Sequence, residues 1–288
     1  MSFGANGFLT SPRTRGLMTD LLWMPASDGD KDTGANPNYV RSFDATVKKA
    51  TEEWLMLDRT AFYAEGGGQP SDVGTLTWDG GEAQVKHVSK RGLVKHEFSG
   101  DAPPAGALVH GEIDWALRHQ HMRMHTSQHI LSGVMWHLHQ ARTAGNQIKA
   151  SRSRVDFDPL DVDDEALRAV QDEVNRVLSS DLPIRVYDAP RADLEARLAA
   201  DAHNDRNLLG LVPQSVKVLR VVEVYDPENR VADYGGTVDF CPCAGTHVAR
   251  TGEIGSMEII GKESKGAGKQ RVRYVLKDGR QEVEHASA

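Results

Sequence analysis

The amino-acid sequence predicts an α+β protein in which a small N-terminal β-barrel is followed by an α/β two-layer domain with a mainly antiparallel sheet. Between residues 42 and 98 the chain consists of short β-like runs separated by glycine turns, which is typical of a small barrel or sandwich. Near residue 113 the hydrophobic period becomes helical, and helical and β-like segments then follow one another to residue 276. The 288 residues are enough for two domains of roughly 100–200 residues each. We expect an extension or disordered segment at 1–17, a barrel-like domain at 18–113 and a second domain at 114–288.

Turn signals in the first half support the barrel. Three consecutive glycines stand at 66–68, and Asp79-Gly80-Gly81 lies between the β-like runs 75–78 and 83–85. An Asp-Gly turn between two such runs is a strong hairpin signal.

Helices and strands alternate in the second half. One helix is expected from Trp115 to Met135, and a second from Asp164 to Leu178, where apolar residues recur three or four apart and Pro183 follows. The other expected elements are a weaker helix at 191–200 and strands at 216–224, 234–240, 255–260 and 271–276.

The composition excludes several classes of protein. No stretch approaches the roughly 20 apolar residues of a membrane span, and the first residues lack the apolar core of a secretory signal. The two cysteines, Cys241 and Cys243, are one residue apart, which favours thiols over a disulfide. Neither a P-loop nor a Ser-His-Asp motif is visible, so we expect no nucleotide cofactor, no membrane partner and a cytoplasmic location.

The charge of the chain is unevenly distributed. Its formal net charge is −7, so a nucleic-acid partner requires a local basic patch. One such patch precedes the C-terminus, with five cations and one acid, Glu263, between residues 261 and 274; an acidic run lies at 156–173. The patch consists of Lys262, Lys265, Lys269, Arg271 and Arg273, with Arg118 and Arg123 as a second group.

Two pairs of residues have the spacing of metal ligands. His125 and His129 are four residues apart on the first expected helix, so both imidazoles can face one metal, although His121 lies a further turn upstream. Cys243 and His247 are also four apart, in a glycine-containing loop. Thiolate and imidazole ligands favour zinc over magnesium or calcium, so we expect one tetrahedral Zn²⁺ per chain.

Three separated motifs, in this order, resemble the alanyl-tRNA editing family, which comprises the editing domain of alanyl-tRNA synthetase and the free-standing AlaX proteins. They are Phe62-Tyr-Ala-Glu-Gly-Gly-Gly-Gln-Pro-Ser-Asp-Val-Gly74, His125-Thr-Ser-Gln-His129 and Cys243-Ala-Gly-Thr-His247. The resemblance extends from about residue 18 to 276 and is to the longer AlaX type. One departure is Ala244, where the family has glycine; Cys241 also offers a second thiolate.

The resemblance implies a zinc-containing editing domain at 114–288 that hydrolyses the ester between a wrong amino acid, serine or glycine, and alanine tRNA. The implied zinc ligands are His125, His129, Cys243 and His247, and the Gly-rich segment Gly66, Gly67, Gly68 and Gln69 would approach the substrate. Zinc could acidify the attacking water, polarise the ester carbonyl, or bind the substrate so that a tRNA hydroxyl orients the water. The basic patch would contact tRNA phosphates.

The limited specificity of amino-acid selection explains why an editing enzyme is needed. A binding pocket that accepts alanine discriminates only about 10²-fold against serine, which merely adds a hydroxyl. A second site that hydrolyses the wrong ester is therefore needed. Gln69 and Thr126 are candidates to hydrogen-bond the serine hydroxyl. Two alternatives stay open: a zinc-stabilised tRNA-binding module without catalysis, and a deacylase of the threonyl-tRNA editing type.

Overall fold

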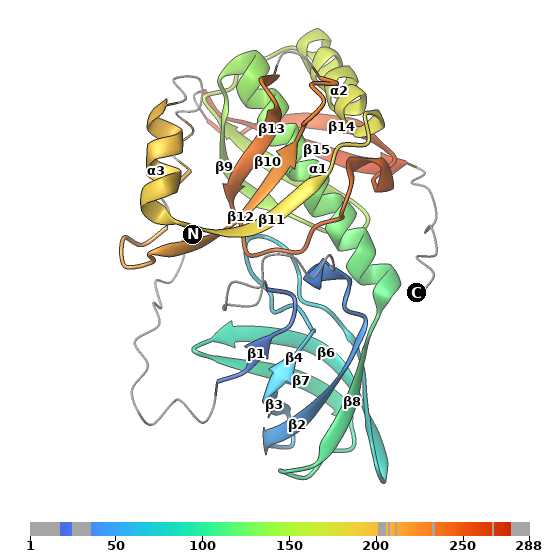
Figure 1. The fold of residues 1–288 in the computed structure, drawn as a ribbon. Helices are drawn as coiled ribbons and strands as arrows, with labels where there is room; N and C mark the ends of the chain where they lie inside the picture. The colour runs from blue at the N-terminus through green and yellow to red at the C-terminus, as the bar shows by residue number, and fades with distance from the viewer. Residues whose placement is uncertain are drawn as a thin grey trace.

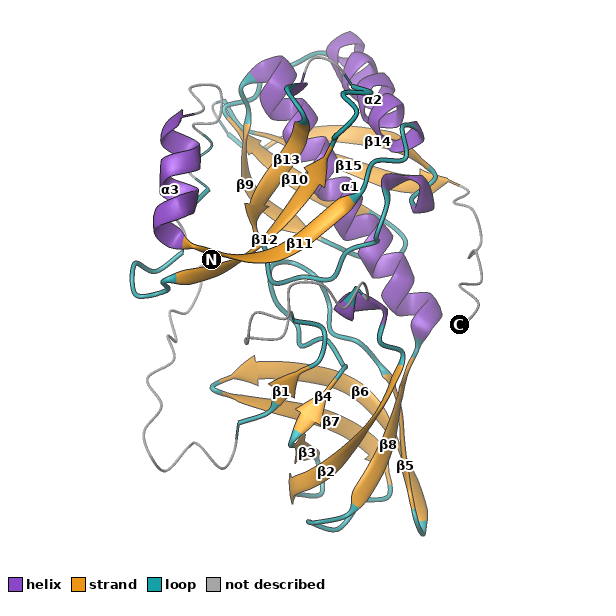
Figure 2. Ribbon diagram, viewed as in Figure 1, coloured by secondary structure: helices purple, strands orange, loops and turns teal. Residues whose placement is uncertain are grey.

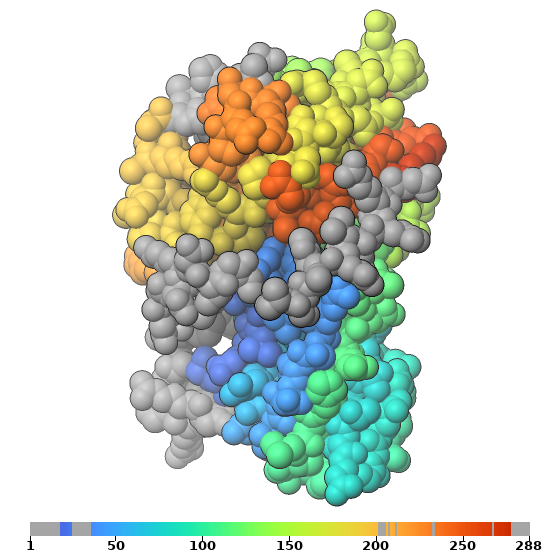
Figure 3. Space-filling view, turned by 45° about the vertical axis from the view of Figure 1, so that its right-hand side comes forward, coloured from blue at the N-terminus to red at the C-terminus, as the bar shows by residue number. Residues whose placement is uncertain are grey.

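The computed structural model describes residues 18–24, 36–200, 206, 208–210, 212–231, 234–266 and 268–277. A six-stranded barrel forms one half of the molecule, and three helices with two antiparallel sheets form the other (Figures 1 and 2). In the space-filling view the barrel, coloured from blue through cyan to green, makes up one end of the visible face (Figure 3). The α+β prediction is thereby confirmed. The domain boundaries stay a prediction, and the segment 1–17 lies outside the described residues.

The barrel closes through antiparallel pairing in the order β2-β3-β7-β6-β5-β8. Its interior is a separate apolar cluster that includes Phe43, Leu55 and Leu76. The hairpin predicted at Asp79–Gly81 joins β5 to β6, and Gly80 has a φ of 99° there. The strands are β2 (Ser42–Ala50), β3 (Trp54–Leu57), β5 (Gly74–Trp78), β6 (Gly81–Arg91), β7 (Leu93–Gly100) and β8 (Leu108–Ile113); β1 (Asp20–Leu21) and β4 (Arg59–Thr60) pair beside them.

The second half contains a four-stranded sheet, β14-β15-β10-β9, and a three-stranded sheet, β11-β12-β13. Their strands are β9 (Arg142–Gln147), β10 (Ser153–Asp158), β11 (Ile184–Pro190), β12 (Val218–Tyr225), β13 (Thr237–Pro242), β14 (Ser256–Ser264) and β15 (Gln270–Lys277). The helices are α1 (Trp115–His139), α2 (Asp164–Ser179) and α3 (Arg191–Ala200). The last four predicted strands and all three predicted helices are therefore present.

Helix α1 is the central element of this half. Asp114 caps it by accepting a hydrogen bond from the Leu117 amide, and the helix ends at Gln140, which has a left-handed φ of 53°. It thus continues one turn beyond the predicted end at Met135. Gly133 lets the helix approach β13 closely, because a Cβ there would lie 2.4 Å from the Val238 carbonyl oxygen.

In the second half, three strands, β9, β10 and β11, were not predicted. The sequence of β9, Arg-Thr-Ala-Gly-Asn-Gln, has no alternation of apolar residues, and it lies at the edge of its sheet. In β10 a short alternation does exist, since Val155 and Phe157 are buried between half-buried neighbours. No helix in the described part of the chain is long and apolar enough to cross a membrane.

Candidate metal centre

The four predicted ligand side chains meet in one place. His125 and His129 come from α1, and Cys243 and His247 from the loop after β13; one possible ligand atom from each lies within 4.8 Å of the other three. The three histidines are buried and Cys243 is half-buried. The structure thus brings together two segments separated by more than a hundred residues.

The spacing of the donor atoms suits a tetrahedral zinc ion. Cys243 Sγ lies 3.7 Å from His125 Nε2 and 3.4 Å from His247 Nε2. Zinc bonds of about 2.0 Å to nitrogen and 2.3 Å to sulfur, at a tetrahedral angle, would place such atoms about 3.5 Å apart. The donor set and its spacing therefore fit zinc.

Each histidine is held by a protein group on its Nδ1 side. His125 Nδ1 is 2.8 Å from Gln69 Oε1, His129 Nδ1 is 2.9 Å from Asp239 Oδ2, and His247 Nδ1 is 3.1 Å from Thr126 Oγ1. A metal-binding histidine characteristically donates its other ring N–H to such an oxygen, which fixes the tautomer and the ring orientation. This arrangement directs the Nε2 atoms of His125 and His247 toward Cys243.

The buried charges of the cluster favour a thiolate. Burial alone would raise the pKa of the Cys243 thiol, yet the charges of His125 and His247 hold that pKa well below its ordinary value. Burial and the charge of His125 lower the pKa of His247 well below its ordinary value. Burial would lower the pKa of His129, yet Cys241 and Asp239 raise that pKa well above its ordinary value. A thiolate at Cys243 is the state in which the sulfur binds a metal, and a metal would displace a proton from His129.

Cys241 and His121, the two open alternatives, lie outside the four-residue group. Cys241 Sγ is 3.5 Å from His129 Nδ1 and belongs to a separate group with His129 and Asp239. The Asp239 carboxylate is already paired with Arg206 as well as with His129. His121 is buried, and its Nδ1 has no hydrogen-bond partner among the described residues.

The Gly-rich segment forms a tight turn that delivers Gln69 to the cluster. Gly66 and Gln69 pair through both backbone hydrogen bonds, and the two residues between them have φ values of 58° and 86°. Positive φ at both central positions defines a type I′ turn, which favours glycine. At Gly68 a Cβ would also lie 1.9 Å from Asn146 Oδ1, so the turn is packed against β9.

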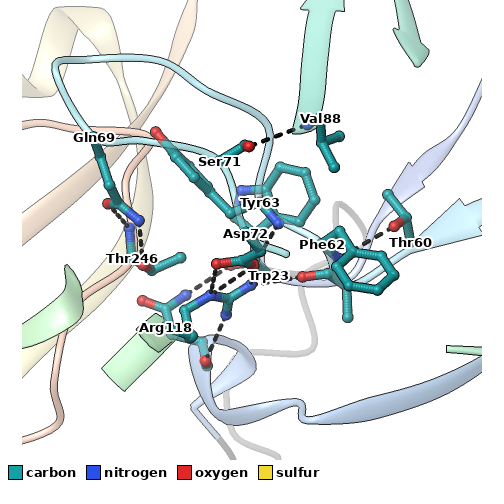
Figure 4. A network of polar contacts seen from close by, with 12 residues as sticks. Trp23, Thr60, Phe62, Tyr63, Gln69, Ser71, Asp72, Val88, Arg118 and Thr246 are labelled. Carbon is teal, nitrogen blue, oxygen red and sulfur yellow. Dashed lines mark hydrogen bonds and ion pairs between the residues drawn. The ribbon is translucent and has the colours of Figure 1, made fainter. Parts of the chain in front are cut away.

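The Gln69 side chain is fully buried and connects three segments. Its Oε1 accepts from the Thr246 amide at 3.1 Å as well as facing His125, and its Nε2 donates to Thr246 Oγ1 at 2.8 Å (Figure 4). Thr126 is buried as well, and its Oγ1 accepts from the Val248 amide at 3.2 Å. Both residues thus support histidines of the cluster.

In the loop 243–247, the position that requires glycine is Gly245. A Cβ at Gly245 would lie 2.2 Å from the His125 ring and 3.0 Å from Gln69 Oε1. Ala244 is exposed, and it is not among the non-glycine residues with positive φ in the described part of the chain. The alanine in place of the family's glycine therefore causes no backbone strain.

A buried ion pair joins Asp72, three residues after Gln69, to Arg118 near the start of α1. Arg118 Nε donates to both carboxylate oxygens of Asp72, at 2.9 and 2.8 Å, and Arg118 Nη2 donates to Asp72 as well (Figure 4). Arg118 also donates to the carbonyls of Asn38 and Ala61. Its side chain is fully buried, so the prediction that Arg118 contacts tRNA is wrong.

Asn38 links this ion pair to the loop 243–247, because its backbone carbonyl accepts from Arg118 and its side-chain Oδ1 accepts from the His247 amide at 2.8 Å. Sequence reasoning missed Asp72, Asp239 and Asn38 as supporting residues. Asp72 lies within the first quoted motif, and Asp239 lies four residues before Cys243, so an acid close to a motif was the available signal.

The five cations of the predicted basic patch lie on β14, β15 and their turn, and none of them contacts a residue of the cluster in the described part of the chain. Each of them is within ion-pair distance of a carboxylate, so five cations face four acids. The pairs are Lys262 with Asp164 (3.0 Å), Lys265 with Glu263 (3.2 Å), Lys269 with Asp158 (2.8 Å), Arg271 with Asp156 (2.6 Å) and Arg273 with Glu263. Arg123 is half-buried and donates to the Ile254 carbonyl.

Comparison with known proteins extends over both halves. The family model described as "tRNA synthetases class II (A)" matches residues 37–117, and that described as "Threonyl and Alanyl tRNA synthetase second additional domain" matches 219–273. The alanyl-tRNA editing protein AlaX-M of Methanosarcina acetivorans is 35% identical over 250 residues, which are 83% of this chain and 96% of the relative. AlaX-M of Methanosarcina mazei is 34% identical over 250 residues, 83% of this chain and 94% of the relative.

The alanine–tRNA ligase of Thermofilum pendens is 38% identical over 256 residues, which are 85% of this chain but only 26% of the ligase. The second family model covers both threonyl and alanyl enzymes, whereas the relatives that match over nearly their whole length are alanyl-tRNA editing proteins. The chain therefore belongs to the alanyl-tRNA editing protein family.

Proposed function

We propose that this chain hydrolyses the ester that joins serine, and also glycine, to alanine tRNA. The observation that carries the proposal is the cluster in which three histidines, each anchored on its Nδ1 side, converge on Cys243. Family membership makes alanine tRNA the nucleic acid in question.

His125, His129, Cys243 and His247 would hold one zinc ion. When bound, zinc supplies Lewis-acid chemistry for ester hydrolysis. Gln69 and Thr126 keep His125 and His247 in the tautomer that presents Nε2, and Gly245 leaves room for the His125 ring. We assign Gln69 and Thr126 to this positioning role first. Recognition of the serine hydroxyl by either residue would require it to exchange a present partner for the substrate.

The Gly66–Gly68 turn supports substrate binding, because Gly67 and Gly68 are exposed immediately before the buried Gln69. Backbone without side chains permits close approach of a ligand. We retain Lys262, Lys265, Lys269, Arg271 and Arg273 as candidate phosphate contacts. Their carboxylate partners would have to release them, so we expect each to contribute little.

Deacylation assays test the proposal. The wild-type chain is mixed with alanine tRNA charged with serine, glycine or alanine, and with threonine tRNA charged with serine. We expect hydrolysis of serine-charged and glycine-charged alanine tRNA and retention of the alanine ester. Binding of tRNA with every ester intact would instead identify a binding module, and preference for threonine tRNA would identify the threonyl type.

A further inference from the structure

A second group of cations lies on the hairpin formed by β9 and β10. Between residues 141 and 155 the chain contains Arg142, Lys149, Arg152 and Arg154 and no acid. This local excess of four positive charges equals that of the segment 261–274, within a protein whose net charge is −7. Its position in the fold distinguishes it from the other group.

The turn of this hairpin lies against the Gly-rich segment. The Ile148 amide donates to the Gly68 carbonyl at 2.8 Å, and Gly68 is packed against Asn146. The residue after Gly68 is Gln69, which contacts His125 of the metal cluster. One backbone hydrogen bond and one further residue therefore connect the turn to the cluster.

Helix α1 also holds the hairpin. Gln120 Nε2 donates to the Ala150 carbonyl at 2.8 Å, and Asn146 Nδ2 donates to Gln128 Oε1 at 3.1 Å. Gln128 is the residue before His129, so the contact lies beside a second member of the cluster. The turn at 148–152 is thus fixed beside the exposed glycines of the Gly-rich segment.

Two cations of the hairpin differ from all five of the C-terminal group. Lys149 and Arg152 are exposed and form no ion pair with any residue that the structure describes. Arg154 is half-buried, donates to Gln147 and lies 3.6 Å from Asp156, while Arg142 lies over the Trp136 ring. An unpaired exposed cation can bind a phosphate without first losing a carboxylate partner.

We propose that Lys149 and Arg152 provide the main phosphate contacts for the acceptor end of the tRNA. This inference rests on the proposed function, because it assumes that an aminoacyl ester enters beside Gly67 and Gly68. Contacts at the 148–152 turn would position the RNA backbone next to the Gly-rich segment without reading its sequence. The C-terminal group would then act only as a weaker, peripheral surface.

The test compares two double variants that remove the same formal charge. Lys149→Ala with Arg152→Ala is measured against Lys265→Ala with Lys269→Ala, using the zinc-loaded full chain and an uncharged alanine tRNA transcript. Dissociation constants are determined between about 50 and 200 mM salt. We expect the first variant to bind about tenfold more weakly and to have a salt slope lower by about 1 to 2, and the second variant, at the peripheral contacts, to show a smaller loss.

Zinc content and thermal midpoint of both variants confirm that the fold and cluster are intact. A larger loss in the Lys265/Lys269 variant, an equal loss in both, or no loss in either would overturn the inference while leaving the hydrolase proposal standing. If the wild-type chain neither binds the transcript nor hydrolyses the ester, the proposed function fails and the inference fails with it.

Discussion

Buried histidines in the two halves of the molecule have different surroundings. In the barrel, His96 is fully buried and both of its ring nitrogens have protein partners, Thr60 Oγ1 at 2.9 Å and the Leu55 carbonyl at 3.4 Å. In the metal cluster, His125 and His247 have an oxygen partner on Nδ1 only, and Nε2 faces the Cys243 sulfur. Burial of a histidine alone therefore does not indicate a metal site. Convergence of the Nε2 atoms of several histidines on one thiol does indicate a cation site.

The difference has an energetic consequence. A barrel histidine completes its hydrogen bonds within the protein, so it needs no ligand. The Nε2 atoms and the thiol of the cluster gain a binding partner only when a metal enters. The free energy of metal binding then adds to the free energy of unfolding of the protein.

Removing the sulfur should abolish the cation site. We expect Cys243→Ala to lose bound zinc and to reduce deacylation by at least about 100-fold, because a ligand is affected more than the outer partners of a metal site. Zinc content per chain and initial deacylation rates measure the effect. Cys241→Ala is the matched control and should keep both; zinc retained at full stoichiometry in Cys243→Ala would refute the ligand assignment.

Breaking the ion pair between the two halves should destabilise the protein. Arg118→Ala leaves the Asp72 carboxylate buried without its cation, which we expect to cost about 3–5 kcal/mol of unfolding free energy. Denaturant unfolding measures this loss. For comparison, Arg250→Ala removes an exposed pair with Asp181 and should cost less than about 1 kcal/mol; equal losses in the two variants would contradict the structural role of Arg118.

Loss of an outer partner should weaken the cluster without removing it. We expect Gln69→Ala to lower zinc affinity or activity by about 10–100-fold, because His125 loses the oxygen that orients it. Competition with a chelator and deacylation rates provide the measurement. Gln84→Ala, at an amide on the barrel surface, should change neither; a Gln69 variant indistinguishable from wild type would show that the His125 ring needs no such support.

His96, the buried histidine of the barrel, should make the free energy of unfolding depend on pH. Burial lowers the pKa of His96 to about 4, below its ordinary value of 6.5, so the unfolded chain binds a proton that the folded chain does not. Stability should therefore fall as the pH is lowered from about 6.5 to 4, with a contribution from His96 of at most about 3 kcal/mol. Urea unfolding across this range, compared with His96→Gln, isolates the contribution, and parallel curves would contradict it.

Local sequence patterns predicted the parts of the molecule that local geometry determines. The helical spacing of His125 and His129, the apolar period of α2 and the Asp-Gly turn between β5 and β6 all depend on neighbouring residues. The recognisable Cys243 loop and its similarity to a known family supplied the second half of the cluster.

Contacts between distant segments could not be read from the sequence in the same way. Gln69 is 56 residues from His125, and Asp239 is 110 from His129, so only folding brings them together. The acidic run and the basic patch were both visible, but their pairing depends on the register of β10 with β15, which places Asp156 opposite Arg271. Strand β9 was missed because tertiary contacts, not its own pattern, hold it in the sheet.

Zinc K-edge X-ray absorption of the purified wild-type chain measures which atoms surround the metal. We expect one zinc per chain with about three nitrogen neighbours near 2.0 Å and one sulfur near 2.3 Å, the sulfur being lost in Cys243→Ala. A zinc environment made of oxygen atoms alone, or a sulfur neighbour that persists in Cys243→Ala and disappears in Cys241→Ala, would contradict it.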